Sequence, residues 1–200
     1  MKHSNFSPGQ RILKVTKSIL LAVIITGLGL PGFAQQNYQL SDVQQWTVAG
    51  TSSIHDWEMV SQGATGTARI ETAGSSIKAI PSLKLELSAK TLKSGKSSMD
   101  DNAYKALNAD RHPNIQFELT GVESIKGQEI VAKGRLTISG TTKVMTLKAN
   151  YSVSGNAVTF SGSHPISFSE FDLKPPTAVF GTIKTGDQLN IQFETTFKTK

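Results

Sequence analysis

The stretch EIVAKGRLTISGTTKVMTLKANYSV, residues 129–153, alternates apolar and polar side chains on both sides of Ser139-Gly140. In residues 130–138 and again in 145–153, nearly every second position is apolar. This alternation is typical of strands that bury one face, and a Ser-Gly pair suits a tight turn. The stretch therefore predicts an antiparallel hairpin with one apolar face.

The same pattern recurs along the chain. Strands are predicted at 83–89, 115–119 and 189–197, and weaker ones at 43–50, 56–70 and 157–168. Turn residues separate them at Gly121, Gly127, Gly155-Asn156 and Gly186-Asp187. One helix is predicted over about 98–109, with Ser98 as N-cap, Asp101 completing a shortened capping box, and His112-Pro113 ending it.

About eight successive strands of this kind must hide one face. Up-and-down order favours an all-β fold, an eight-stranded antiparallel lipocalin-like barrel with one short inserted helix, because closure removes exposed sheet edges. Eight strands enclose a space that side chains can just fill, or that can hold one small ligand. A two-sheet sandwich is the main alternative architecture. An outer-membrane barrel is disfavoured because the aromatic residues do not form two girdles.

The N-terminus has the features of a secretory signal. Four basic residues and no acid precede Gln35, residues 19–30 are largely apolar, and Gly32-Phe33-Ala34 offers a cleavage site. We expect a signal peptide over 1–34, cleaved after Ala34, and one domain over 35–200. The apolar run is short for a membrane span, which needs roughly 20 residues. A retained N-terminal anchor is the alternative.

Composition excludes several classes of protein. The whole chain carries a net charge of +6, but four of its 21 basic residues lie before Gln35, which leaves 17 against 15 acids. That balance is too weak for a nucleic-acid binder. There is no cysteine, so disulfides, thiol nucleophiles and cysteine metal sites are excluded. His55, His112 and His164 do not pair at metal-ligand spacing, and we expect no metal or cofactor.

Ser52, His55 and Asp56 raise the question of a hydrolytic triad. His55 and Asp56 are adjacent, so their side chains would point to opposite faces of a strand. A triad is assembled from separated segments, with the base held between the other two groups. We therefore interpret the stretch as the start of a strand, anchored in the core by Trp57. No catalytic residue is expected.

The inward faces of the predicted strands define the candidate ligand-binding surface. An enclosed apolar surface suits an apolar guest. Its expected residues are Leu85, Phe117, Leu136, Ile138, Leu147, Tyr151, Phe160 and Phe193, with Trp57 and Phe180 near the ends. The segment 174–187, KPPTAVFGTIKTGD, contains two prolines and an apolar Val-Phe pair in a loop. It could form a lid across a barrel mouth or a plug that packs on the core, and both remain open.

Four segments together resemble the YceI-like domain family, over about Tyr38 to Phe197. They are GTSSIHDWEM, LKSGKSSMDDNAYKALNADRHPNIQFELTG, GRLTISGTTKVMTLKA and FDLKPPTAVFGTIKTGDQLNIQFETTF. The resemblance implies an eight-stranded lipocalin-like barrel crossed by a helix, in an exported protein that holds a long isoprenoid or similar lipid. No catalytic residues come with it.

The favoured hypothesis is therefore an exported, periplasmic or secreted protein that carries or stores an apolar, polyisoprenoid-like lipid. It would bind no nucleic acid and would not insert stably into a membrane, and a homodimer is left open. The alternatives are a solid-cored interaction module of the envelope, without a small-molecule ligand, and a cofactor-free enzyme that uses Ser52, His55 and Asp56.

Overall fold

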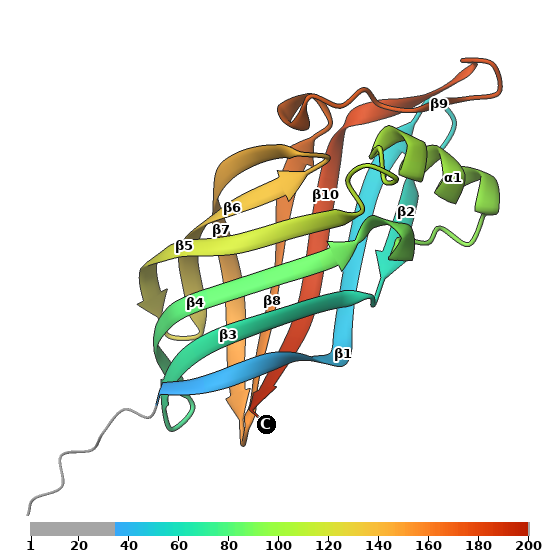
Figure 1. The fold of residues 1–200 in the computed structure, drawn as a ribbon. Helices are drawn as coiled ribbons and strands as arrows, with labels where there is room; N and C mark the ends of the chain where they lie inside the picture. The colour runs from blue at the N-terminus through green and yellow to red at the C-terminus, as the bar shows by residue number, and fades with distance from the viewer. Residues whose placement is uncertain (1–34, 200) are drawn as a thin grey trace, which may run out of the picture. The chain divides into compact units, whose positions relative to one another are not determined.

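The computed structural model describes residues 35–199, so the predicted signal peptide over 1–34 lies outside the described residues. The fold is an eight-stranded antiparallel barrel, as the alternation predicted (Figure 1). Its wall consists of β1 (Gln35–Ser52), β3 (Ala64–Ala73), β4 (Ser76–Ser88), β5 (Asn114–Lys126), β6 (Glu129–Ile138), β7 (Thr141–Ser154), β8 (Ala157–Ser167) and β10 (Ile183–Thr199). The accessory elements are β2 (Trp57–Ser61), β9 (Thr177–Ala178), α1 (Ser97–Ala106) and the short helices η1 (Ala89–Thr91) and η2 (Ser169–Phe171).

Pairing between β1 and β10 closes the barrel, with Trp46 opposite Phe193. A register shift between Leu40 and Gln44 divides β1, so that its first part pairs with β3 and its second with β2. Gln44 is buried at this shift, where its amide donates to the Ala64 carbonyl at 2.9 Å and accepts from the Trp46 indole N–H at 2.9 Å. The shift is therefore a hydrogen-bonded feature that fixes the orientation of Trp46.

The hairpin predicted over residues 129–153 forms as expected. Thr137 pairs with Thr142 across the turn, and Ser139 and Gly140 have φ of 49° and 84°. Two positive φ values match the backbone twist of a type I′ turn, which joins adjacent antiparallel strands. The predicted strand over 56–70 is instead divided into β2 and β3. The break falls at residues 62–63, where Gly63 lies so close to Thr91 that an added Cβ would be 2.5 Å from its side chain.

The start and end of α1 differ from the prediction. The helix begins at Ser97, its N-cap is Lys96, and Ser98 does not cap it. The buried carboxylate of Asp100 instead accepts from the Ser94 N–H at 2.8 Å and the Ser94 hydroxyl at 2.7 Å. These hydrogen bonds, chiefly that from the Ser94 side chain, hold the pKa of Asp100 below its usual range. The helix ends before 109 because Asn108 has a φ of 50°, a conformation typical of helix termination.

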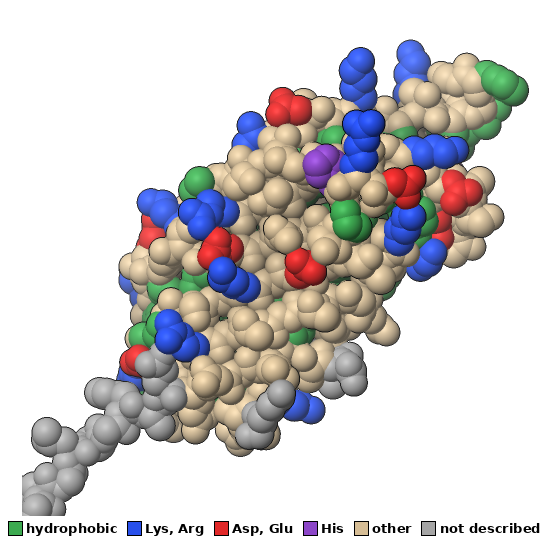
Figure 2. All heavy atoms as spheres, viewed as in Figure 1, with side chains coloured by type: hydrophobic (Ala, Val, Ile, Leu, Met, Phe, Trp, Pro, Cys, Tyr) green, Lys and Arg blue, Asp and Glu red, His purple; other side chains and the backbone are tan. Residues whose placement is uncertain are grey.

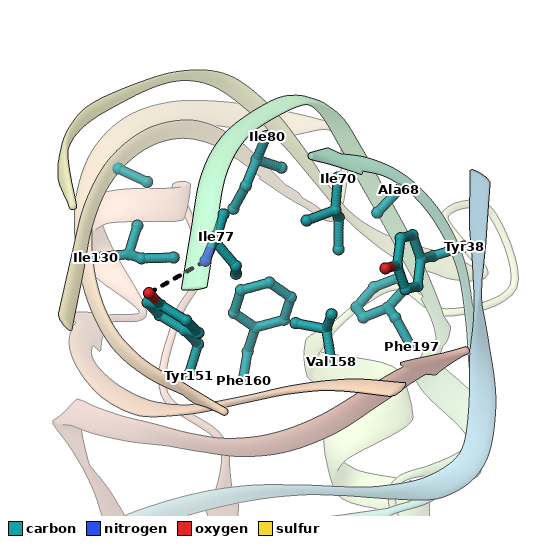
Figure 3. Packing of buried hydrophobic residues seen from close by; sticks show 11 residues of the cluster. Tyr38, Ala68, Ile70, Ile77, Ile80, Ile130, Tyr151, Val158, Phe160 and Phe197 are labelled. Carbon is teal, nitrogen blue, oxygen red and sulfur yellow. Dashed lines mark hydrogen bonds between the residues drawn. The ribbon is translucent and has the colours of Figure 1, made fainter. Parts of the chain in front are cut away.

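One end of the barrel is closed by a packed apolar cluster, which we call the floor (Figure 3). It contains Tyr38, Ala68, Ile70, Ile77, Ile80, Ile130, Ala132, Tyr151, Val158, Phe160 and Phe197. The Tyr151 hydroxyl accepts from the Ile77 N–H at 3.2 Å and donates to the Gly127 carbonyl at 2.9 Å. The floor therefore joins β4, β7 and the β5–β6 turn, and it seals the end that lies away from α1.

The outer face of the barrel is polar and charged, as the alternation predicted. Glu118 on β5 lies 2.9 Å from Lys84 on β4 and 2.6 Å from Arg135 on β6, in a row across three strands. The hydrogen bonds from Arg135 and Lys84 lower the pKa of Glu118 to about 2. Within residues 35–199, no helix is long and apolar enough to cross a bilayer.

Candidate functional site: an apolar cavity inside the barrel

Above the floor, the barrel encloses a cavity of about 410 Å³ with an almost entirely apolar lining. It begins at Ile80, Ile130 and Phe160 and reaches the surface beside Ile54 and Lys96, an opening that we call the mouth. Its volume falls in the range of roughly 300–1,000 Å³ that is typical of small-molecule sites. The interior is therefore not filled by side chains, contrary to the architecture that a solid-cored module requires.

Eight of the ten residues predicted for the ligand-binding surface line this cavity. They are Trp57, Leu85, Phe117, Leu136, Ile138, Leu147, Phe160 and Phe193. They come from β2, β4, β5, β6, β7, β8 and β10, so the surface surrounds the cavity. The alternation places them correctly because successive side chains of a strand point to opposite faces of the wall.

Tyr151 and Phe180, the other two residues of the predicted surface, do not line the cavity. Tyr151 faces inward but packs within the floor, where it is only 4% exposed and its hydroxyl bonds to the backbone. Phe180 is fully exposed at the tip of the β9–β10 hairpin. The turn that carries it directs its side chain away from the cavity, which its neighbour Ala178 does line.

The cavity has further wall residues that the sequence analysis did not select. Trp46 and Ile191 line it from β1 and β10, and the Trp46 ring stacks on Phe193 with centroids 5.8 Å apart. Alternation within 43–50 would have identified Trp46, because Trp46 and Val48 share one face of that strand. Helix α1 contributes Met99, Ala103 and Leu107, which cover the mouth from one side.

Interior glycines make room for the rings that line the cavity. A Cβ added at Gly134 would lie 2.2 Å from the Phe117 ring, and one at Gly162 would lie 2.8 Å from the Phe193 ring. A Cβ added at Gly50 would likewise lie 2.5 Å from the Trp57 ring. Each ring therefore occupies the space next to a glycine that a side chain would otherwise fill. This arrangement explains how a barrel with so many interior aromatic side chains keeps an open centre.

Polar groups are sparse in the cavity and gather near the mouth. His55, Lys96 and Asn102 lie around the opening, whereas His164 and Thr195 lie on the wall deeper inside. Burial lowers the pKa of the half-buried His164, and the Glu170 carboxylate opposes that shift. The neutral imidazole is therefore the favoured form at the wall.

Ser52, His55 and Asp56 form a turn at the mouth. The Ser52 hydroxyl donates to the His55 carbonyl at 2.7 Å and accepts from the His55 N–H at 3.2 Å. The His55 Nδ1 lies 2.7 Å from the Asp56 carbonyl oxygen, not from its carboxylate. The Ser52 and His55 side chains thus bond to the backbone of the β1–β2 loop, and serine, imidazole and carboxylate are not connected in series.

The segment 174–187 forms part of the rim of the mouth. Pro176, Ala178 and Ile183 contribute to the cavity lining, and β9 pairs with β10 through Ile183 and Ala178. The tip, Val179 and Phe180, projects away from the cavity. The segment therefore borders the opening and does not plug the core.

A closed eight-stranded barrel with an enclosed apolar cavity defines a class of small binding proteins whose interior holds one apolar guest. The chain belongs to the YceI-like domain family, whose sequence model matches residues 33–197. The barrel and the family both fit lipid binding. No curated protein sequence matches the chain.

Several solved structures share the fold, among them the three that follow. BcnA of Burkholderia cenocepacia has a TM-score of 0.67 at 17% identity, covering 78% of this chain and 98% of BcnA. A polyisoprenoid-binding domain from Saccharophagus degradans, implicated in plant cell wall breakdown, has a TM-score of 0.63 at 8% identity, covering 84% and 100%. The Campylobacter jejuni YceI protein has a TM-score of 0.53 at 20% identity, covering 68% and 81%.

Proposed function

We propose that this protein is an exported carrier or store of an apolar, polyisoprenoid-like lipid, whose chain occupies the barrel cavity. The observation that carries the proposal is the 410 Å³ cavity with its apolar lining, closed by the floor at one end and reaching the surface at the other. A charged or strongly polar guest would lose its hydration there without gaining partners. The similarity to a polyisoprenoid-binding domain supports the same class of ligand.

The cavity also supports an orientation for the ligand. Its polar groups concentrate at the mouth, where Lys96 and Asn102 flank the opening from the start of α1. An apolar chain would lie among Phe117, Leu147 and Phe193, and the polar end of the lipid would stay at the mouth. Binding without catalysis is proposed because Ser52 and His55 of the one candidate triad bond to the backbone instead of to each other and the Asp56 carboxylate.

Mass spectrometry of an organic extract tests the proposal. The protein is expressed with its own N-terminal segment in a bacterial host and purified without detergent. We expect a co-purifying apolar lipid, and an intact mass that starts at Gln35. A protein that carries no lipid and takes up no added geranylgeraniol would contradict the carrier role. An intact mass that retains residues 1–34 would contradict the proposed cleavage.

A matched pair of substitutions on β7 tests the location of the ligand. Leu147 lines the cavity, whereas Val144 on the same strand is 70% exposed on the outer face. Leu147→Arg places an unpaired charge in the cavity, at a cost of several kcal/mol, roughly. We expect folded Leu147→Arg to lose geranylgeraniol binding and Val144→Arg to keep it. Equal binding by both variants would show that the site lies elsewhere.

A further inference from the structure

The tip of the β9–β10 hairpin exposes apolar side chains that no part of the described chain covers. Phe180 is fully exposed and Val179 is 61% exposed. Figure 2 shows apolar side chains at the end of the molecule where Figure 1 places this hairpin, beyond α1 and at the same end as the mouth. Exposed apolar groups gathered at one place mark contact surfaces more often than chance exposure does.

The turn at this tip is chemically unusual. The Gly181 N–H donates to the Ala178 carbonyl at 3.1 Å, and Val179 and Phe180 between them have φ of 50° and 53°. Gly181 follows with a φ of 86°, and the Thr182 N–H donates to the Val179 carbonyl at 3.1 Å. The loop between the paired Ala178 and Ile183 therefore has a left-handed backbone, which Gly and Asn adopt most readily. A β-branched valine in this conformation is strained. Val-Phe is thus a poor choice for the turn itself, which indicates that the two apolar side chains serve another purpose.

The charges of the hairpin are all positive. Lys174 and Lys184 are exposed and are the only charged residues between Asp172 and Asp187. In the part of the chain that the structure describes, neither lysine forms an ion pair. Apolar side chains flanked by lysines are the combination that binds an anionic bilayer surface, with the cations at the headgroups and the apolar groups beneath them.

The exposed tip is continuous with the mouth of the cavity. The Ser53 N–H donates to the Lys184 carbonyl at 2.9 Å, and the Lys184 N–H donates to the Ser53 hydroxyl at 3.2 Å. This pair of bonds joins the hairpin to the β1–β2 loop, where Ile54 is 61% exposed and also lines the cavity. An apolar path therefore runs from Phe180 and Val179 along Ala178 and Ile54 into the barrel.

We propose that Val179, Phe180 and Ile54, with Lys174 and Lys184, form a membrane-docking tip that binds reversibly to an anionic lipid bilayer. Docking sets the mouth of the cavity against the bilayer, so that an apolar lipid passes between membrane and barrel without crossing water. The role of docking in lipid transfer rests on the proposed function. Docking itself can be measured without a ligand in the cavity.

Vesicle flotation tests the docking tip. The full chain is expressed with its own N-terminal segment so that it undergoes its natural processing, and is mixed with vesicles of phosphatidylcholine alone or with phosphatidylglycerol. The informative variant is Val179→Asn with Phe180→Gly, because Asn and Gly adopt positive φ most readily and so preserve the loop. We expect wild-type protein to float with anionic vesicles and the double variant to partition at least tenfold less.

Two further variants separate the contributions of the apolar tip and of the lysines to vesicle binding. Val144→Asn removes an exposed apolar side chain from β7, outside the tip, and should leave partitioning unchanged. Lys174→Gln with Lys184→Gln should remove the preference for phosphatidylglycerol, by roughly fivefold per lysine. Equal flotation of wild type and the Asn-Gly variant, or no flotation of wild type, would overturn the docking tip. No flotation of the wild type would instead favour a protein partner at this surface, and equal flotation would place the membrane contact elsewhere on the molecule.

Binding of geranylgeraniol from solution distinguishes the carrier role from the docking role. The Asn-Gly variant should bind geranylgeraniol delivered from ethanol with wild-type affinity, yet extract it from vesicles at least tenfold more slowly. Failure of wild type to bind dissolved geranylgeraniol would contradict the carrier role and leave docking intact. Wild-type extraction rates in the Asn-Gly variant would contradict the docking role and leave the carrier role intact.

Discussion

Replacing Gly134 with alanine adds one methyl group to the inner face of β6, beneath the Phe117 ring. The new Cβ would lie 2.2 Å from Phe117 Cζ and 2.3 Å from Cε2, whereas ordinary contact begins at 3.4 Å. The backbone cannot yield easily on the Leu136 side, because β5 and β6 pair without interruption from Phe117↔Leu136 to Leu119↔Gly134. The ring must therefore move by about 1.2 Å, away from the wall and into the cavity.

This displacement has two measurable consequences. Overpacking of this kind lowers the free energy of unfolding by about 1–3 kcal/mol. A ring that enters the cavity also displaces two or three methylene groups of a bound chain, each worth about 0.8 kcal/mol of burial. A loss of about 2 kcal/mol raises the Kd about thirtyfold.

The two tryptophans of the chain, Trp46 and Trp57, both line the cavity, so intrinsic fluorescence reports its occupancy. Geranylgeraniol is titrated into the delipidated protein, and urea denaturation gives the free energy of unfolding. Gly121→Ala on β5 is the matched control, because an added Cβ there meets nothing within 4 Å. It should leave the Kd unchanged and stabilise the fold by about 0.4–1 kcal/mol.

Wild-type affinity in folded Gly134→Ala would refute the claim that the ring borders the ligand. Should that variant fold poorly, Gly162→Ala provides a milder form of the same test. Its added Cβ would lie 2.8 Å from both the Phe193 ring and the Lys148 carbonyl oxygen, so a smaller ring displacement, a smaller rise in Kd and some strain between β7 and β8 are expected.

Three further predictions concern the floor, the wall and the outer face. Tyr151→Phe leaves buried backbone groups without their partner, so urea denaturation should show a loss of about 1–3 kcal/mol, with geranylgeraniol affinity unchanged. The pKa of His164 is lowered from 6.5, so the unfolded chain binds more protons just below that pH, and stability should fall as pH drops from 6.5 toward the folded pKa. His164→Gln should flatten this part of the stability profile, and an unchanged slope would contradict the assignment. The Glu118 carboxylate, paired with Arg135 and Lys84, should titrate in carbon-detected NMR with a midpoint at about 2, and an ordinary midpoint near 4.5 would contradict the ion pairs.

The barrel could be predicted from the sequence because its strands repeat one simple pattern. Residues 130–138 and 145–153 alternate so regularly that both the hairpin and its inward face follow directly, and closure follows from the number of such strands. The same rule located Phe117, Leu147 and Phe193 on the cavity wall. In each of these cases local periodicity alone determines which way a side chain points.

The position of a side chain along the barrel axis could not be predicted from alternation. Alternation assigns Tyr151 to the inward face but does not say whether it lies in the floor or the cavity, because that depends on the stagger between strands. The exposed position of Phe180 was not predicted, because Val-Phe carries no signal of a left-handed backbone and only the structure reveals one. The start of α1 was misassigned because Asp100 accepts a hydrogen bond from Ser94, which lies in the loop before the helix rather than in its first turn.

The position of a heavy-atom label inside the protein tests the central claim most directly. Crystals of the protein loaded with a brominated isoprenoid alcohol are measured at the bromine absorption edge. The account predicts an anomalous peak inside the barrel, among Phe117, Leu147 and Phe193, with the unlabelled chain running toward Trp57 and the mouth. A barrel filled with ordered water or rearranged side chains, with bromine only on the outer surface, would contradict it.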